Sequence, residues 1–289
     1  MRYLSYLLPW QFSPTACAVF TLTLVIYVRG LLVLRGEAVR VRLWRPLVFF
    51  LGLALNYAVL QTYFDFLAQH MFWIHRLQHL ILHHIGPVLL VLSAPVPILR
   101  AGIPAAAWRV LRKSWVSGPI GGLWRALQHP LIAPVLFVGL IYFWLIPSVH
   151  FTAMIDQRRY LLMNWSMLVD GILFWWLMLA PREAQGACAV RYGLRFIILT
   201  AVALPQIALG AYIALSSRPL FSIYALCGRA WAISPMLDQQ LGGLLTWIPG
   251  AMMSAVGGIV VLHHALAEER RTLAHAAPAE RDGSAGAPA

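Results

Sequence analysis

Long apolar segments alternate with short polar segments along most of the chain. A helix that crosses a membrane needs about 20 mostly apolar residues, because each residue adds about 1.5 Å and the hydrocarbon layer is about 30 Å thick. Segments of this kind lie at about Pro14–Leu34, Pro46–Phe66, Ile74–Leu99, Pro130–Pro147, Tyr160–Ala180, Leu194–Leu215 and Leu241–Leu266. The pattern therefore predicts an all-α, polytopic membrane protein, a bundle of seven transmembrane helices.

Histidines gather where the third apolar segment begins. Five of the ten histidines lie between His70 and His84, and His75, His79 and His83 recur every four residues. On one helix these three side chains share a face, because residues four apart are neighbours. Neutral imidazole is a proton carrier and a metal ligand. Polar side chains inside a membrane span indicate a functional site, although each histidine could instead bond a neighbouring carbonyl group.

A carboxylate falls in the middle of the fifth segment. Asp170 lies about ten residues into that segment, and His83 lies about eight residues into the third. Because each helical residue adds about 1.5 Å, the two side chains have a similar depth, and His83 is the natural partner for Asp170. Asn164, two turns earlier, extends the same polar seam. The alternative is that Asp170 bonds nearby polar groups and serves packing alone.

The last apolar segment begins with a polar motif. Ser234 suits an N-cap and Pro235 suits the first helical position. Asp238 follows in the first turn, where a carboxylate complements the helix dipole. The dipole does not explain why Asp238, Gln239 and Gln240 stand together before two glycines. We therefore treat Asp238 and Gln239 as candidate site residues.

The composition excludes several other classes of protein. Apolar residues make up 61% of the chain and charged residues 11%, which is not the composition of a soluble globular domain. The net charge of +12 could suggest nucleic acid. The basic residues fall between the apolar segments, however, so we expect contact with the lipid bilayer and not with nucleic acid. Cys17, Cys188 and Cys227 form no Cys-x-x-Cys pair and predict neither disulfides nor a thiolate metal site.

Basic residues are divided unevenly between the two sides that the seven segments define. With the N-terminus outside, 16 of the 22 lysines and arginines fall in inner segments and six in outer segments. Because arginine and lysine favour the cytoplasmic side, the sequence predicts an N-out, C-in orientation. This orientation places His75, His79, His150 and Asp238 near the outer face.

Two further polar segments fall on the predicted inner side. Ala105–Gly118 spaces Trp108, Leu111 and Trp115 as on one helical face, with basic residues between them, which predicts an amphipathic helix on the membrane surface. The end of the chain is rich in Ala, Pro, Gly and charge. We therefore expect a transmembrane domain at residues 1–266 and a disordered cytoplasmic tail at residues 267–289.

Several motifs occur together in one order along the chain. They are His75-Arg76-Leu77-Gln78-His79 with Pro87 and Pro95 after it, Gln128-His129-Pro130, Gly171-Ile172-Leu173-Phe174-Trp175-Trp176, Asp238-Gln239-Gln240-Leu241-Gly242-Gly243 and Trp247-Ile248-Pro249-Gly250. This combination resembles the CtaG-type cytochrome c oxidase assembly proteins. The resemblance runs from about Leu60 to His264.

The resemblance implies a multi-pass protein of the bacterial inner (cytoplasmic) membrane that is needed to mature haem-copper oxidases. Its implied task is to help load copper into the oxidase, without an enzymatic activity of its own. Cytochrome c oxidase subunits are the implied partners, with other copper chaperones beside them. The sequence departs from the family where Tyr160 and Asn164 replace histidines at the start of the fifth helix. It also lacks a histidine in Trp144-Leu145-Ile146-Pro147, for which His150 is the candidate replacement.

We interpret the outer-face histidines as transient copper ligands. His75 and His79 are the first candidates, and His83, His150 or Asp238 would complete the site. Imidazole binds copper well, whereas a carboxylate is a poorer ligand for Cu(I), so Asp238 could instead orient a histidine. The supporting positions are Gln78, Asn164, Asp170 and Gln239.

Three alternatives stay open at this point. A haem-binding membrane protein would use two of His75, His79, His83, His84 and His150 as axial ligands. A copper permease would use the seam around Asp170 as its path. A purely structural assembly chaperone would bind no metal.

The orientation can be tested with reporter fusions. We expect a reporter fused after Arg281 to be active only in the cytoplasm, and one inserted between Arg218 and Asp238 to be active only outside, because 16 of the 22 basic residues lie on the inner side. A cytoplasmic signal from the second fusion would reverse the placement of every candidate ligand.

Overall fold

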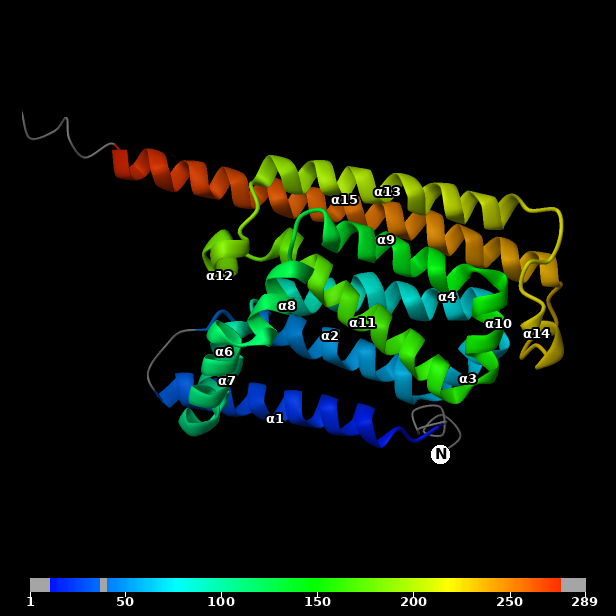
Figure 1. Cartoon of the computed structure of the whole chain (residues 1–289), viewed down its shortest axis with the longest axis horizontal. Coiled ribbons are helices and arrows are strands. Elements are labelled where there is room, and N and C mark those ends of the chain that lie inside the picture. Colours follow the sequence, from blue (N-terminus) through cyan, green and yellow to red (C-terminus); the bar gives the residue numbers. More distant parts are fainter. Residues whose placement is uncertain (1–10, 37–40, 277–289) are drawn as a thin grey trace, which may run out of the picture.

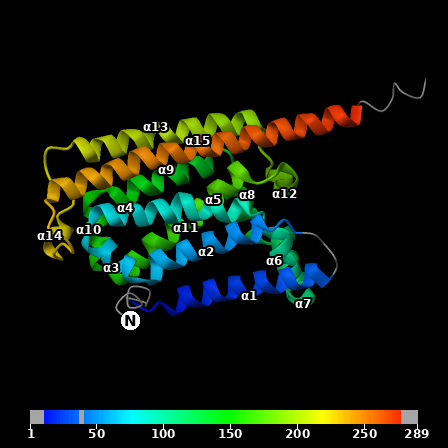
Figure 2. The same ribbon diagram turned by 180° about the vertical axis from the view of Figure 1, so that it is seen from behind.

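The protein is represented by a computed structural model that describes residues 11–36 and 41–276. The regular elements of these stretches are helices, and the long ones lie side by side (Figures 1 and 2). The long helices are α1 (Pro14–Gly36), α2 (Trp44–Gln61), α11 (Gln157–Leu179), α13 (Tyr192–Leu215) and α15 (Pro235–Ala276). The shorter elements are α3 (Tyr63–His70), α4 (Phe72–Leu80), η2 (Ile81–Ile85), α5 (Gly86–Leu92), α6 (Val96–Gly102), α7 (Ala105–Ser117), α8 (Pro119–Leu127), α9 (Ile132–Leu145), α10 (Pro147–Ile155), α12 (Arg182–Gln185), η3 (Gly186–Cys188) and α14 (Ile223–Leu226).

The helices fit a protein that crosses a membrane several times. In the described part of the chain, α1, α11, α13 and α15 are each long and apolar enough to span a bilayer. Three bent pairs could each form one more span: α2 with α3 at 57°, α4–α5 with α6 at 75°, and α8 with α9 at 75°. The all-α, polytopic architecture is therefore confirmed with four to seven candidate spans. The count of seven and the N-out orientation stay predictions.

The side chains are distributed as a membrane-embedded bundle requires. On α13, Phe196, Ile197 and Leu204 are each more than half exposed, whereas Arg195 and Gln206 on the same helix are buried. Lipid tails accommodate exposed apolar groups, but polar groups in the interior must find partners within the protein. The buried polar side chains therefore determine which helices have to meet.

Helix α4 continues into η2 and α5 without a break, which makes one long element from Phe72 to Leu92. It ends before Pro95, because a proline disfavours the helical conformation of the residue that precedes it, and Ala94 there adopts a positive φ of 49°. The middle of the element, η2, is a π-helical turn. Because η2 holds one more residue per turn than an α-helix, the regular four-residue histidine spacing does not continue unaltered to His83.

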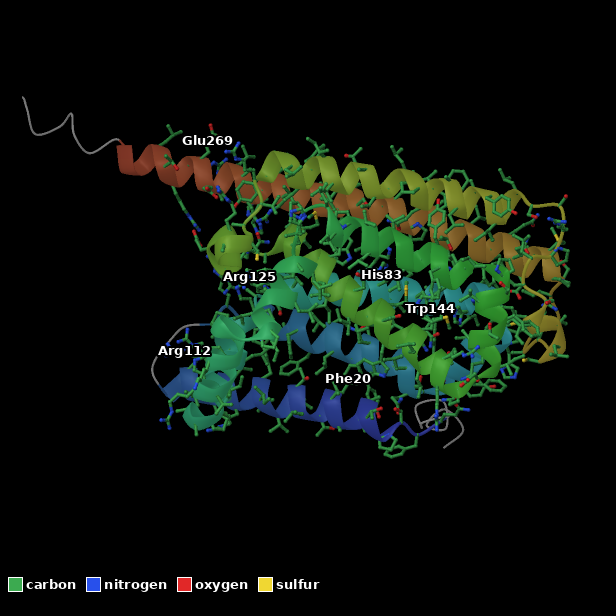
Figure 3. All side chains as sticks on the ribbon, viewed as in Figure 1. Phe20, His83, Arg112, Arg125, Trp144 and Glu269 are labelled. Carbon is green, nitrogen blue, oxygen red and sulfur yellow. The ribbon has the colours of Figure 1, made fainter. Side chains whose placement is uncertain are left out.

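The two ends of the bundle hold different segments. The start of α1, the junctions at α3 and α10, and α14 lie at one end, whereas α6, α7, α8, α12 and the end of α15 lie at the other (Figures 1 and 2). Figure 3 places Arg112 and Arg125 at the second end. The segments that the sequence assigns to the outer and inner sides are thus gathered at separate ends.

Several local predictions can be compared with the described residues. Ser234 Oγ accepts a hydrogen bond from the Leu237 amide at 3.1 Å and Pro235 is the first residue of α15, so both assignments are confirmed. Helix α7 is present as predicted, although the side chains of Leu111 and Trp115 lie outside the described residues. The expectation of disorder is wrong for residues 267–276, because α15 continues through them. The rest of the predicted tail, 277–289, lies outside the described residues.

Helices α1 and α6 cross in close contact at two glycines. A Cβ atom on Gly102 would lie 1.9 Å from the carbonyl oxygen of Ile26, and one on Gly30 would lie 1.9 Å from that of Ile98. We expect Gly102→Ala to lower the thermal unfolding midpoint of the detergent-solubilised protein by about 3–10 °C, because forcing the backbones apart costs roughly 1–3 kcal/mol. Gly139→Ala is the matched control, since a Cβ there has no neighbour within 4 Å. Identical midpoints for the two variants would contradict this close crossing.

Candidate functional site

Helices α4 and η2 carry a row of buried polar side chains through the centre of the bundle. His75, Gln78, His79 and His83 are each at most 1% exposed. His75 is the nearest of them to the start of α4, and His83 lies about midway along the bundle (Figure 3). The predicted histidine helix is therefore an interior element, and each of its polar groups needs a partner.

Three histidines lie together near the start of α4, and we call them the histidine cluster. The ring centroid of His75 lies 4.3 Å from that of His79 and 5.0 Å from that of His150. His150 belongs to α10, so two segments far apart in the sequence supply the cluster. The structure thus brings together three of the five predicted ligands, including the residue expected to replace a missing family histidine.

His75 differs from its neighbours because neither nitrogen of its ring has a hydrogen-bond partner at close distance and good angle, and the ring has only a weaker contact with the backbone of Ala68. The side chain is 0% exposed, and neither Nδ1 nor Nε2 has such a close partner among the described residues. A buried polar group without a partner costs about 1–3 kcal/mol, which is why such groups are rare and call for an explanation. An imidazole held in this way is suited to bind an ion, because its lone pair is not engaged.

His150 is oriented by hydrogen bonds on both sides of its ring. Nδ1 lies 3.1 Å from the carbonyl oxygen of Trp144, and Nε2 lies 3.0 Å from the hydroxyl of Tyr224. A carbonyl can only accept, so Nδ1 carries the proton and the lone pair of Nε2 accepts from Tyr224. A histidine held through Nδ1–H to a carbonyl is oriented as many metal ligands are, with Nε2 as the donor atom.

His79 has both ring nitrogens engaged. The guanidinium of Arg76 lies 3.2 Å from Nδ1, and Oδ1 of Asn164 lies 3.2 Å from Nε2. Arginine can only donate, so Nδ1 accepts and Nε2–H donates to Asn164. Arg76 is itself buried, and its Nε donates to the hydroxyl of Thr246 at 2.9 Å. His79 could bind a metal through Nδ1 only if Arg76 moved away.

His83 and Asp170 form the pair that their equal depth predicts. Nε2 of His83 lies 3.0 Å from Oδ2 of Asp170, so the predicted partnership is confirmed. The lone pair of Nδ1 has no partner among the described residues. Helix α11 approaches closely at this point, because Gly171 leaves room for the carbonyl of His83, only 2.6 Å from where a Cβ would stand. Trp175 donates to the same carbonyl at 3.0 Å.

Asp65 anchors a second polar network that the sequence reasoning missed. Its carboxylate accepts from the hydroxyl of Tyr160 at 2.7 Å, from Gln78 Nε2 at 2.9 Å and from Gln69 Nε2 at 2.9 Å. Asp65 is buried and makes no ion pair within the described stretches. The sequence does contain a signal for this network, because Asp65 lies inside the predicted span Pro46–Phe66. A carboxylate within a span needs a buried partner, as was argued for Asp170. Gln78 was predicted to support the histidines, but the bond to Asp65 shows that it holds α3 against α4.

Asp238 lies outside the histidine cluster and holds the beginning of α4. Its Oδ2 and Oδ1 accept from the backbone amides of Phe72 and Trp73 at 3.2 and 3.0 Å. Arg229 completes the group with an ion pair at 3.4 Å. Asp238 therefore complements a helix dipole, as the simpler interpretation held, but the dipole is that of α4 and not of its own helix.

Gln239 supports the segment that precedes α15. Its Oε1 accepts from the amide of Leu220 at 2.6 Å, and its Nε2 donates to the carbonyls of Ile213 and Arg218 at 3.2 and 3.1 Å. All three partners belong to the end of α13 or the segment after it. Gln239 therefore fixes this connection, and these hydrogen bonds do not involve the histidine cluster.

The ligand geometry limits what the cluster can bind. Among the described residues, no three His, Cys, Asp or Glu side chains converge closely enough to hold one metal ion. Imidazole groups in this conformation can thus supply two ligands to an ion at most. Cu(I) accepts low coordination numbers and imidazole ligands. His75, and His150 once Tyr224 releases its Nε2, therefore fit that ion better than a metal that needs four or more ligands.

Residues 25–268 match the family described as cytochrome c oxidase caa3 assembly factor. This match covers most of the chain. The chain belongs to this family.

Curated relatives extend the match to mycobacteria. The chain is 31% identical over 195 residues to an uncharacterised protein of Mycobacterium bovis, covering 61% of this chain and 27% of that protein. An uncharacterised protein of Mycobacterium leprae is 28% identical over 190 residues, with the same two shares. The chain thus spans about a quarter of the length of the curated relatives that it matches. No solved structure matches it significantly.

The positions where this chain departs from the assembly-factor pattern still face the cluster. The ring of Tyr160 lies 6.2 Å from that of His75, and Asn164 bonds His79. A side chain with an oxygen atom thus stands beside these histidines at both positions where the resemblance implies a histidine. A further residue that sequence reasoning missed is Tyr224, which carries no signal because it comes from an irregular stretch around the four-residue α14.

The buried cap of α4 can be tested by mutation. We expect Asp238→Ala to lower the thermal unfolding midpoint by about 3–10 °C, because it removes both acceptors from the start of α4 and leaves Arg229 unpaired, a loss of roughly 1–3 kcal/mol. Asp156→Ala is the matched control. Asp156 caps α11 through the amides of Arg158 and Arg159, but its side chain is 46% exposed. A control that loses as much stability as Asp238→Ala would show that burial adds nothing to the cap.

Proposed function

We propose that this assembly factor carries Cu(I) at the histidine cluster and passes it to an oxidase subunit at the outer face of the bacterial inner membrane. The observation that carries the proposal is His75, a fully buried imidazole with no close hydrogen-bond partner among the described residues and only a weaker contact with the backbone of Ala68, which can engage one of its two nitrogens at most. Membership of the family supports the role in oxidase assembly. The copper chemistry is our inference from the side chains.

The two available donors would share the ion. His75 offers a ring nitrogen without a close partner, and His150 offers Nε2 once the hydroxyl of Tyr224, which now donates to it, turns away. The carbonyl of Trp144 holds the opposite nitrogen of His150 and keeps its tautomer fixed, which raises the donor quality of Nε2. Copper supplies no catalytic step here, because it is cargo.

A site with few ligands suits delivery better than storage. An ion held by two imidazoles keeps open coordination positions that an acceptor protein can occupy before the first bonds break. The cluster also lies near the end of the bundle that holds α3, α10 and α14 (Figure 1). A partner would therefore meet the cluster from that end, which the charge distribution assigns to the outside.

The proposal predicts which histidines matter. We expect His75→Ala and His150→Ala to reduce Cu(I) affinity at least tenfold, measured by competition with a coloured Cu(I) chelator, and to lower cellular oxidase activity per unit of accumulated protein. Added copper should partly restore the activity, because only affinity is lost. His264→Ala is the matched control, since His264 also has an unpartnered buried Nδ1 but lies on α15 far from the cluster.

Two results would contradict the copper role. If His75→Ala and His150→Ala keep wild-type affinity and oxidase activity, the cluster is structural and a metal-free chaperone is the better interpretation. If the purified protein instead shows one haem per chain in its visible spectrum, the histidines are axial ligands. We expect no stoichiometric haem.

A further inference from the structure

A small cavity, about 10 Å³ in volume, lies beside the histidine cluster and has room for about one water-sized ligand. We call it the inner cavity. His83, His84 and Met167 line it, together with His79 and Arg76. Only His79 is shared with the histidine cluster. The other two histidines therefore face a separate space deeper along the same helix.

Two histidines offer unpaired nitrogens beside this cavity. Nδ1 of His83 and Nδ1 of His84 are buried and have no hydrogen-bond partner in the described part of the chain, and the two ring centroids lie 5.2 Å apart. Asp170 accepts from Nε2–H of His83, so the lone pair of Nδ1 is free. The π-helical turn η2 allows successive histidines to be buried together, and such turns are common at functional sites.

Met167 adds a donor of a different kind. It belongs to α11, is 1% exposed and lines the same cavity. A thioether is a soft ligand that favours Cu(I) over harder cations. Together with the two imidazoles it gives three donor groups, two with nitrogen and one with sulfur.

We propose that the inner cavity is a second Cu(I) site, with His83, His84 and Met167 as its ligands and His79 as the link to the histidine cluster. The inference rests on the copper-carrying function proposed above and extends it inward. His79 lines the cavity, and its ring lies 4.3 Å from that of His75. An ion could therefore pass between the two sites over one short step once Arg76 moves away from Nδ1 of His79.

The buried charges limit how many ions the two sites hold. Arg76, which lines the cavity, carries a positive charge, and Asp170, which bonds His83, carries a negative charge when ionised. One monovalent cation is therefore added to a pair that is neutral when Asp170 is ionised. A second ion, or Cu(II), would leave more positive charge uncompensated in a medium of low dielectric constant. The two sites therefore share one Cu(I).

The test is X-ray absorption spectroscopy of the purified full chain, loaded with one equivalent of Cu(I). Because the ion spends only part of its time at the inner site, we expect less than one sulfur ligand per copper in the wild-type protein. We expect Met167→Leu to lose this sulfur signal and still to bind one copper. Met163→Leu is the matched control, because Met163 is also fully buried on α11, one turn earlier, but does not line the cavity. His83→Gln should lose the sulfur contribution as well, which covers the case in which Met167→Leu does not accumulate.

The outcomes separate the second site from the proposed function. A wild-type protein that binds one copper with nitrogen ligands alone would overturn the inner site and leave the histidine cluster as the carrier. Sulfur that persists in Met167→Leu would overturn the assignment of Met167. A protein that binds two equivalents of Cu(I) tightly would overturn the proposal that the two sites share one ion. A wild-type protein that binds no Cu(I) would overturn both proposals.

Discussion

The structure depends on one constraint: the polar side chains of α4 and η2 are almost fully buried, so neighbouring helices must supply most of their partners. These partners come from three other helices. Asp238 of α15 holds the start of α4, Asp65 of α3 holds Gln78, and Asn164 and Asp170 of α11 hold two histidines. The bundle is therefore assembled around α4 by hydrogen bonds as much as by apolar packing. Removing one partner leaves a buried group unsatisfied, and that penalty makes the arrangement specific.

The sequence predicted those features that depend on distance along a single helix. The apolar segments located the long helices, and Ser234 and Pro235 located the start of α15. The pairing of His83 with Asp170 followed from counting residues to equal depth, because the rise of a helix is constant. The family resemblance was confirmed as well, since several spaced motifs together are far more specific than one.

The rest could not be predicted because it joins segments that no periodicity relates. Asp238 bonds amides about 165 residues earlier in the chain, and His150 is held by Tyr224 from an irregular stretch. The interpretation of Asp238 as a cap identified the correct interaction, a carboxylate at a helix N-terminus. It assigned this interaction to α15, whereas Asp238 caps α4. The π turn at η2 has no sequence signature either, so the spacing of His79 and His83 suggested one unbroken stripe.

The π turn also divides the histidine helix into two parts that can vary separately in evolution. A π turn is equivalent to one residue inserted into an α-helix. Deleting one residue within Ile81–Ile85 would restore α-helical geometry there and leave the helix on either side in nearly its present orientation, because the π turn already accommodates the extra residue. The change would leave the histidine cluster upstream and α5 downstream in place, but it would redirect His83 and His84, which belong to the turn itself. A lineage could thus gain or lose the inner cavity by a single insertion or deletion, without altering the cluster nearer the membrane surface.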